Sequence, residues 1–175
     1  MNEKEILEMV SRTIEEFGIK CKKFSGAITV ELIRKALLEE GFNVSERDVY
    51  INGIPIEVDL LIAQKGISPL TRIQYRPEDV LVVLEIKGRG TFGENSIKSI
   101  SNNFKIIKQA QKNIHCIYIT VSERKNYKWK ATEKNINAPA YTLFWHSGTE
   151  NNLKFDPTGD WKKLIRDPRN IVNTV

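Results

Sequence analysis

The segment from residue 79 to residue 90, DVLVVLEIKGRG, constrains the fold more than any other part of the chain. Five consecutive aliphatic residues, 80–84, precede a break that contains two glycines, a pattern typical of a central β-strand covered on both faces. Because side chains alternate along a strand, Glu85 and Lys87 lie on one face, whereas Ile86 points to the other. A buried acid and base cost free energy unless they are paired or bind a metal. The sequence therefore predicts an ion pair or a cation at the end of this strand.

The Glu-x-Lys spacing is weak evidence for a catalytic site when it stands alone. The same spacing recurs at residues 123–125, and an exposed ion pair at a strand end explains either occurrence without any catalytic role. Residues elsewhere in the chain are needed to choose between a catalytic site and an exposed ion pair.

Length and charge limit the class of protein. A chain of 175 residues is long enough for one domain with a substantial core and short for two, so we expect a single domain over 1–175. The formal net charge of +5 favours a polyanionic partner. Cys21 and Cys116 lack metal-ligand spacing and are expected to be reduced thiols. No leader-like segment and no apolar run of membrane-spanning length is seen, so we expect a cytoplasmic protein with no membrane partner.

Helical periodicity predicts two helices in the first forty residues. Residues 2–17 combine an apolar face with an acidic one, and Gly18 follows as a C-cap. The second helix covers 27–38, with Ser25 as a possible N-cap and Gly41 after its end. Glu31 lies among its apolar positions, which leaves two interpretations open: a functional carboxylate or an ordinary exposed helix glutamate.

From residue 42 the hydrophobic period becomes that of β-strands. Residues 42–44 and 48–51 predict a strand, Asn52 and Gly53 a hairpin turn, and 54–62 the partner strand. Asp59 is followed by three apolar residues and is expected to be interior. If this partner strand lies antiparallel to the strand that ends at Glu85, the two acids come within a few ångströms, although the pattern leaves the register open.

The second half of the chain predicts a crossover helix between two strands. A loop over 63–78, broken by Gly and Pro, precedes the central strand. Helical spacing over 95–112 and a strand over 114–121 then imply a right-handed crossover and a parallel strand pair. We expect a last strand at 140–146 and a short amphipathic helix around Trp161, followed by Pro168. His115 and His146 lack nearby partners for a zinc site or a nucleophilic triad and are interpreted as structural.

Basic residues are candidates for contacts with phosphate. Arg89 lies in the glycine break and Lys105 and Lys108 on the crossover helix. A basic segment over 124–134 interleaves Tyr127 and Trp129 with cations. For Arg89 and for this segment the alternative is an ordinary solvated loop. The cations of the segment are Arg124, Lys125, Lys128, Lys130 and Lys134.

A helix with an acid, a meander with Asp59, the Glu85-Ile86-Lys87 tripeptide and then a helix and a strand resemble the PD-(D/E)xK nuclease superfamily over about residues 25–121. The resemblance implies a restriction-endonuclease-like α/β fold, a mixed four-stranded sheet flanked by helices in the order αβββαβ. The first helix and the extension over 122–175 would be additions. Two departures are visible: the nearest proline before Asp59 is Pro55, and a long loop separates Asp59 from Glu85. They leave open whether Glu57 replaces or assists Asp59.

The resemblance also implies a set of site residues. Asp59, Glu85, the Ile86 carbonyl and Glu31 would bind Mg²⁺ or Mn²⁺, and Lys87 would be the catalytic lysine. The family uses a further polar residue on the following helix, for which the candidates are Lys105, Lys108 and Gln109. Carboxylate oxygens suit these hard cations on chemical grounds alone, and a lysine beside them can orient water or stabilise charge in the transition state.

Three functions remain open from the sequence. The leading hypothesis is a Mg²⁺-dependent endonuclease acting on DNA, related to restriction, repair or recombination, with a homodimer as the arrangement that would allow double-strand cleavage. The second is a catalytically inactive DNA-binding or assembly module with a nuclease fold, and the third an RNA-processing nuclease. Target specificity would reside in 63–78 and in the region after residue 121.

Overall fold

A computed structural model describes residues 4–6, 8–9, 12, 22–89, 94–126, 132–149 and 152–174. A helix and a series of short strands form the first half of this chain, and longer strands alternate with helices over much of the second half. In chain order the elements are α2 (Lys22–Glu39), β1 (Asn43–Val44), β2 (Val49–Ile51), β3 (Ile54–Val58), β4 (Leu60–Ala63), β5 (Gln74–Tyr75), η1 (Pro77–Asp79), β6 (Val80–Arg89), α3 (Glu94–Ala110), β7 (His115–Arg124), α4 (Glu133–Ile136), β8 (Ala140–Thr149), β9 (Asn152–Pro157) and α5 (Asp160–Val172).

A six-stranded mixed sheet in the order β1-β4-β6-β7-β8-β9 forms the centre of the fold. β6 pairs antiparallel with β4 and parallel with β7, and β7 pairs parallel with β8. The α/β class and the parallel pair across α3 are therefore confirmed. The sheet has six strands: β1, β4, β6 and β7 lie side by side, and the β8–β9 hairpin of the C-terminal extension adds two more. The restriction-endonuclease layout of four strands is not confirmed.

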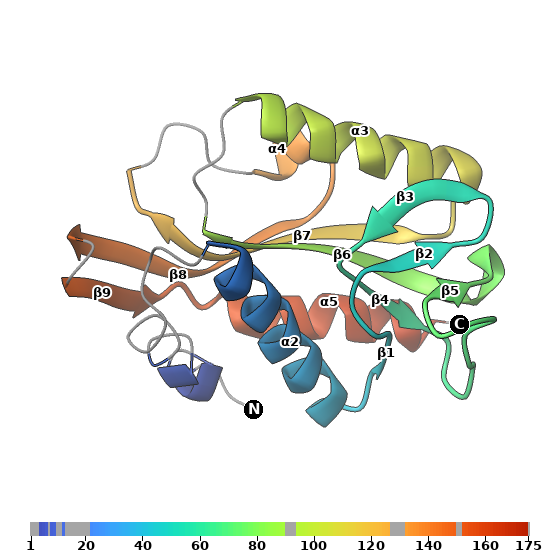
Figure 1. Ribbon diagram of the computed structural model, residues 1–175, viewed down its shortest axis with the longest axis horizontal. Coiled ribbons are helices and arrows are strands. Elements are labelled where there is room, and N and C mark those ends of the chain that lie inside the picture. The colour runs from blue at the N-terminus through green and yellow to red at the C-terminus, as the bar shows by residue number, and fades with distance from the viewer. Residues whose placement is uncertain are drawn as a thin grey trace.

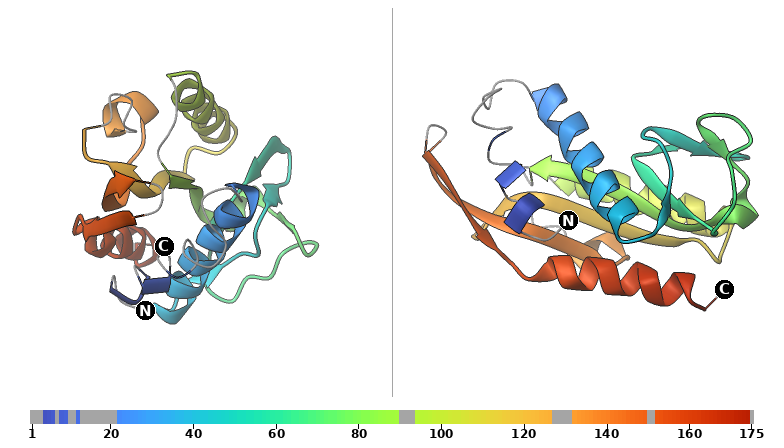
Figure 2. Two further views of the ribbon diagram at one scale, coloured as in Figure 1. Left: turned by 60° about the vertical axis from the view of Figure 1, so that its left-hand side comes forward. Right: turned by 90° about the horizontal axis from the view of Figure 1, so that it is seen from below.

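Helices cover both faces of this sheet (Figure 1, Figure 2). α3 and α4 lie on one face, and α2 and α5 lie on the other. Side chains alternate along β6, so its apolar residues pack against the helices on both faces. Val83 packs in the cluster that contains Phe104 of α3, whereas Leu84 packs in the cluster that contains Ile33 of α2 and Leu164 of α5. The aliphatic run 80–84 is buried on both sides, as a central strand should be.

Residues 54–62, predicted as one strand, form two strands that belong to different sheets. β3 pairs with β2 across the Asn52-Gly53 turn, in a three-stranded sheet of order β3-β2-β5, whereas β4 joins the six-stranded sheet. The chain bends between them at Asp59. The burial pattern explains the division, since β3 alternates between buried and more exposed positions while every residue of β4 is buried.

Other differences concern short or late elements. Residues 42–44 and 48–51, predicted as one strand, separate into β1 and β2. The predicted loop over 63–78 contains β5 and the turn η1, and the strand predicted to be the last is followed by β9. α2 begins at Lys22, so Ser25 lies inside the helix and is not its N-cap. Pro168 lies buried inside α5 and does not end it.

The N-terminal helix predicted over 2–17 falls mostly outside the described residues. Residues 4–6, 8–9 and 12 are helical, and Ile6 is buried against the α2 face of the core. Cys21 also lies outside the described residues, while Cys116 is a buried free thiol. Within the described ranges, the helices are all too short or too polar to span a bilayer.

Candidate functional site

Asp59 lies at the bend where the chain passes from the small sheet to the large one. The position is fixed by backbone pairing on either side, Val49 with Val58 in β2–β3 and Leu60 with Leu84 in β4–β6. The Asp48 N–H also donates a hydrogen bond of 3.2 Å to the Asp59 carbonyl. The bend therefore presents the Asp59 side chain beside the residues that follow Leu84 on β6.

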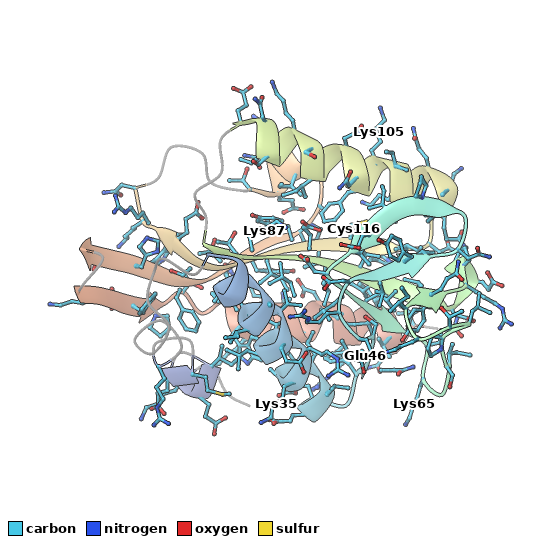
Figure 3. All side chains as sticks on the ribbon, viewed as in Figure 1. Lys35, Glu46, Lys65, Lys87, Lys105 and Cys116 are labelled. Atoms are coloured by element: carbon cyan, nitrogen blue, oxygen red, sulfur yellow. The ribbon has the colours of Figure 1, made fainter. Side chains whose placement is uncertain are left out.

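Asp59, Glu85 and Lys87 converge on the face of the sheet that α3 covers. Lys87 Nζ lies 2.5 Å from Glu85 Oε1 and 3.8 Å from Asp59 Oδ2. The two acidic side chains are 21% and 15% exposed and that of Lys87 is 30% exposed. The sequence predicted antiparallel pairing but left its register open. The register in the structure brings both acids close to the ammonium group of Lys87, which Figure 3 shows near the middle of the molecule.

Burial makes the negative charges of this group costly. Burial raises the pKa of Asp59 above its ordinary value, even though the Lys87 charge and the Ile86 N–H act in the opposite direction. Burial and the nearby Asp59 carboxylate likewise raise the pKa of Glu85 against the effect of Lys87. The site is consequently short of positive charge when both acids are ionised.

Lys87 is held in its charged form. Burial alone lowers the pKa of its ammonium group, but the carboxylates of Glu85 and Asp59 together outweigh burial and raise it above the ordinary value. Lys87 is therefore protonated at neutral pH and serves as the cation of the group.

Ile86 contacts the site through its backbone N–H. That N–H donates a hydrogen bond of 2.6 Å to Asp59 Oδ2, the same oxygen that faces Lys87. The contact orients the carboxylate and leaves Oδ1 directed to no partner among the residues described. The sequence pointed to the Ile86 carbonyl as a ligand, and the contact seen here is made by the other backbone group.

Glu31 is not brought to this group. It lies on α2, which packs on the opposite face of the sheet, and its side chain is 52% exposed. Its carboxylate pairs with Arg34 Nη1 at 3.0 Å. Arg34 also donates hydrogen bonds to the Glu46 carboxylate and to the Ser45 carbonyl. Of the two interpretations left open for Glu31, the structure favours the exposed helix glutamate.

Neither neighbouring acid completes a ligand cluster with Asp59 and Glu85. Glu57 is exposed on β3 and accepts a hydrogen bond from the Tyr50 hydroxyl, and Asp48 pairs with Arg47. Both are near enough for their charges to raise the pKa of Asp59. In the part of the chain that the structure describes, no three His, Cys, Asp or Glu side chains gather in a metal-binding group.

The candidate phosphate-contacting residues lie on several elements. Lys105 and Lys108 line a groove of about 230 Å³ between α3 and α4, whose floor includes Phe104 and Ile136. Gln109, the third candidate polar residue of the helix, lines the same groove. Arg124 ends β7 and is exposed, as is Lys125. Arg89 ends β6, while Lys128 and Lys130 fall outside the described residues.

Two residues of β7 complete the surroundings of the acids, and sequence reasoning missed both. Tyr118 pairs in register with Glu85, and Thr120 with Lys87. Each is only 1% exposed. The signal was present in the sequence, because Tyr118 and Thr120 alternate with isoleucines in a strand already predicted to lie parallel to β6.

The residues present fit a magnesium site of the open kind. Mg²⁺ is typically held by one or two carboxylates, with water and substrate phosphate completing its octahedron. Asp59 and Glu85 supply two carboxylates with raised pKa values, which is the electrostatic situation that a divalent cation relieves.

Comparisons with known proteins support the fold. Neither protein-family models nor curated protein sequences give a match. Among solved structures, NucC of E. coli MS115-1 in its cAAA-bound form matches with a TM-score of 0.65 at 10% identity, over 97% of this chain and 87% of that one. The cAAA-bound NucC of P. aeruginosa ATCC27853 matches with a TM-score of 0.64 at 10% identity, over 97% and 88% of the two chains. The apo form of the E. coli protein gives a TM-score of 0.59 at the same identity and a coverage of 97% and 88%. At this identity the chain shares an overall fold with NucC.

Proposed function

We propose that this chain is a divalent-cation-dependent endonuclease that hydrolyses phosphodiester bonds in DNA, as enzymes of restriction, repair and recombination do. One observation carries the proposal: Asp59 and Glu85, far apart in sequence, meet at Lys87 on one face of the sheet. The PD-(D/E)xK resemblance implies this same trio in this same role. The basic net charge of +5 agrees with a polyanionic substrate.

The two carboxylates would hold Mg²⁺ or Mn²⁺. When bound, the cation lowers the pKa of water and neutralises charge on the phosphate oxygens. Asp59 is prepared for this task because the Ile86 N–H fixes its orientation through Oδ2. Glu85, whose carboxylate contacts Lys87 at 2.5 Å, would be the second residue to hold the cation.

Lys87 would act as an electrostatic stabiliser. Its raised pKa keeps the ammonium group protonated at neutral pH, so it donates hydrogen bonds and does not take a proton from water. A preorganised positive charge beside the scissile phosphate stabilises the negative charge that develops on its oxygens. Removing one such donor typically costs about a hundredfold to a thousandfold in rate.

Cleavage of plasmid DNA by purified variants tests this function. We expect the wild type to nick or linearise DNA with Mg²⁺ or Mn²⁺ and not with EDTA. Asp59→Ala and Lys87→Ala should each lose about a hundredfold or more of that activity. Matched controls are Asp156→Ala, an exposed acid of β9, and Lys35→Ala, an exposed lysine of α2. Glu31→Gln reports in the same assay whether the α2 acid takes part.

Three results would contradict the proposal. Full activity in both Asp59→Ala and Lys87→Ala would place catalysis elsewhere. Salt-sensitive DNA binding without cleavage under any cation would favour the inactive binding module, and cleavage of RNA in preference to DNA would change the substrate to RNA.

A further inference from the structure

Tyr118 lies directly beside the acidic site on the neighbouring strand. It pairs in register with Glu85 across β6–β7, and it packs in the same cluster as Val83 and Cys116. Neighbouring strands in register present paired residues on the same face, so Tyr118 shares a face with Glu85 and Lys87. It is 1% exposed and among the largest fully buried side chains.

The Tyr118 hydroxyl is buried without a hydrogen-bond partner among the residues described. Nearly all buried polar groups in native proteins are paired, and leaving one unpaired costs about 1–3 kcal/mol. The hydroxyl of Thr120 is close enough to oppose the rise in the Tyr118 pKa, yet no hydrogen bond of acceptable geometry joins the two. The protein's described side chains therefore leave a polar atom unsatisfied on the residue that pairs with Glu85.

This hydroxyl is a donor. A tyrosine hydroxyl is protonated at neutral pH, since its ordinary pKa is about 10. Buried on the face of the sheet that carries Glu85, it needs an acceptor oxygen. Glu85 is at present engaged with Lys87 at 2.5 Å. A water molecule that contacts both the Tyr118 and the Glu85 side chains would satisfy the hydroxyl.

We propose that Tyr118 is a positioning residue of the acidic site, whose hydroxyl donates a hydrogen bond to a water that Glu85 also holds and so orients Glu85 to bind a divalent cation. The inference rests on the proposed function for the cation and adds a residue that neither the tripeptide nor the resemblance includes. Outer hydrogen-bond partners of this kind typically change metal affinity about tenfold to a hundredfold.

Tyr118→Phe tests the inference because it removes only the hydroxyl. Titration calorimetry with Mn²⁺ should show about tenfold weaker binding than in the wild type. The thermal midpoint without metal should stay the same or rise, because an unsatisfied buried oxygen is lost. Tyr141→Phe is the matched control: Tyr141 is also buried, but its hydroxyl donates to Asp167. That variant should lower the midpoint and leave Mn²⁺ affinity unchanged.

The outcomes separate this inference from the proposed function. Wild-type Mn²⁺ affinity in Tyr118→Phe, or a drop in its midpoint like that of Tyr141→Phe, overturns the role of Tyr118 even if the wild type cleaves DNA. Mn²⁺ binding that depends on Tyr118 in a protein that cuts no nucleic acid keeps the positioning role and refutes the nuclease. A wild type that binds no Mn²⁺ overturns both.

Discussion

Asp59 and Glu85 show how the site opposes stability when no metal is bound. Both carboxyl groups are largely buried, and the pKa of each is raised despite the presence of Lys87. A raised pKa in the folded state means that protonation favours folding. The contribution is present at low pH and is lost as the pH rises through the folded-state pKa. At neutral pH the ionised pair therefore lowers the free energy of unfolding.

Asp59→Asn should accordingly stabilise the metal-free protein at pH 7. The amide oxygen can still accept the Ile86 N–H but carries no charge, so the cost of burying the ionised carboxylate disappears. We expect a gain of about 2–4 °C in the thermal midpoint, which about 1 kcal/mol produces in a chain of this size. The gain should shrink as the pH falls through the raised folded-state pKa of Asp59, and it should be gone below a pH of about 4, the ordinary value for aspartate.

Thermal melts by circular dichroism in EDTA across this pH range provide the measurement. Asp156→Asn on the exposed face of β9 is the control and should show no gain. A lower midpoint for Asp59→Asn at pH 7 would mean that the pairing with Lys87 outweighs burial, contrary to the direction of the Asp59 pKa.

Sequence reasoning reached Asp59, Glu85 and Lys87 because each departs from its surroundings in a simple way. Each is a charge next to an apolar run, and alternation fixes the face of a strand residue. Glu31 shows the limit of that reasoning. A helical residue among apolar neighbours still lies toward solvent if the helix presents another stripe to the core, and here Ile33, Ala36 and Leu37 form that stripe.

At the scale of elements, α3 carries two of the lysines that the sequence predicts as phosphate contacts, Lys105 and Lys108. The helix covers the face of the sheet that carries the acids (Figure 1), and these two lysines line the groove against α4. Phosphate contacts by lysines release counterions, so each contact contributes to the dependence of binding on salt.

The variant Lys105→Ala/Lys108→Ala should weaken DNA binding and reduce the slope of log affinity against log salt by about 2, one for each lysine. Fluorescence anisotropy with a labelled duplex at several salt concentrations, in Ca²⁺ to prevent cleavage, measures that slope. Lys35→Ala/Lys65→Ala is a matched control, because both lysines are exposed and Figure 3 shows them on the other side of the molecule. An equal loss in the two double variants would mean that α3 has no specific part in binding.

The strand that divides at Asp59 explains why the sequence predicted some elements and missed others. Residues 54–62 keep a continuous apolar alternation, so period alone indicates one strand. The division depends on which sheet each half joins, and that depends on β5 and β6, which lie well downstream. Long-range strand pairing of this kind leaves no local hydrophobic pattern in the sequence. The sequence did not predict the two-residue β5 for the same reason.

At the scale of the whole molecule, the sheet and its covering helices join parts of the chain that are distant in sequence. Arg169 of α5 contacts both the carbonyl and the carboxylate of Glu40 at the end of α2, and its guanidinium lies over Phe42. The helices on the α2 face are thus tied to each other as well as to β6. On the opposite face, Asp59 lies at the bend between β3 of the small sheet and β4 of the large sheet.

A cation at this junction should stabilise the entire fold, because it binds two strands of the folded protein that are independent in the unfolded chain. Ligand at about a hundred times its dissociation constant stabilises the folded state by about 2.7 kcal/mol. The thermal midpoint should therefore rise with added Mn²⁺ in the wild type and not in Asp59→Asn.

Calorimetric titration of Mn²⁺ into the wild type and into Asp59→Asn is the most direct test of the proposal that Asp59 and Glu85 form a cation site. We predict saturable binding to the wild type and at least tenfold weaker binding to Asp59→Asn. Absence of Mn²⁺ binding to the wild type, even with duplex DNA present, or equal binding by both proteins, would contradict it.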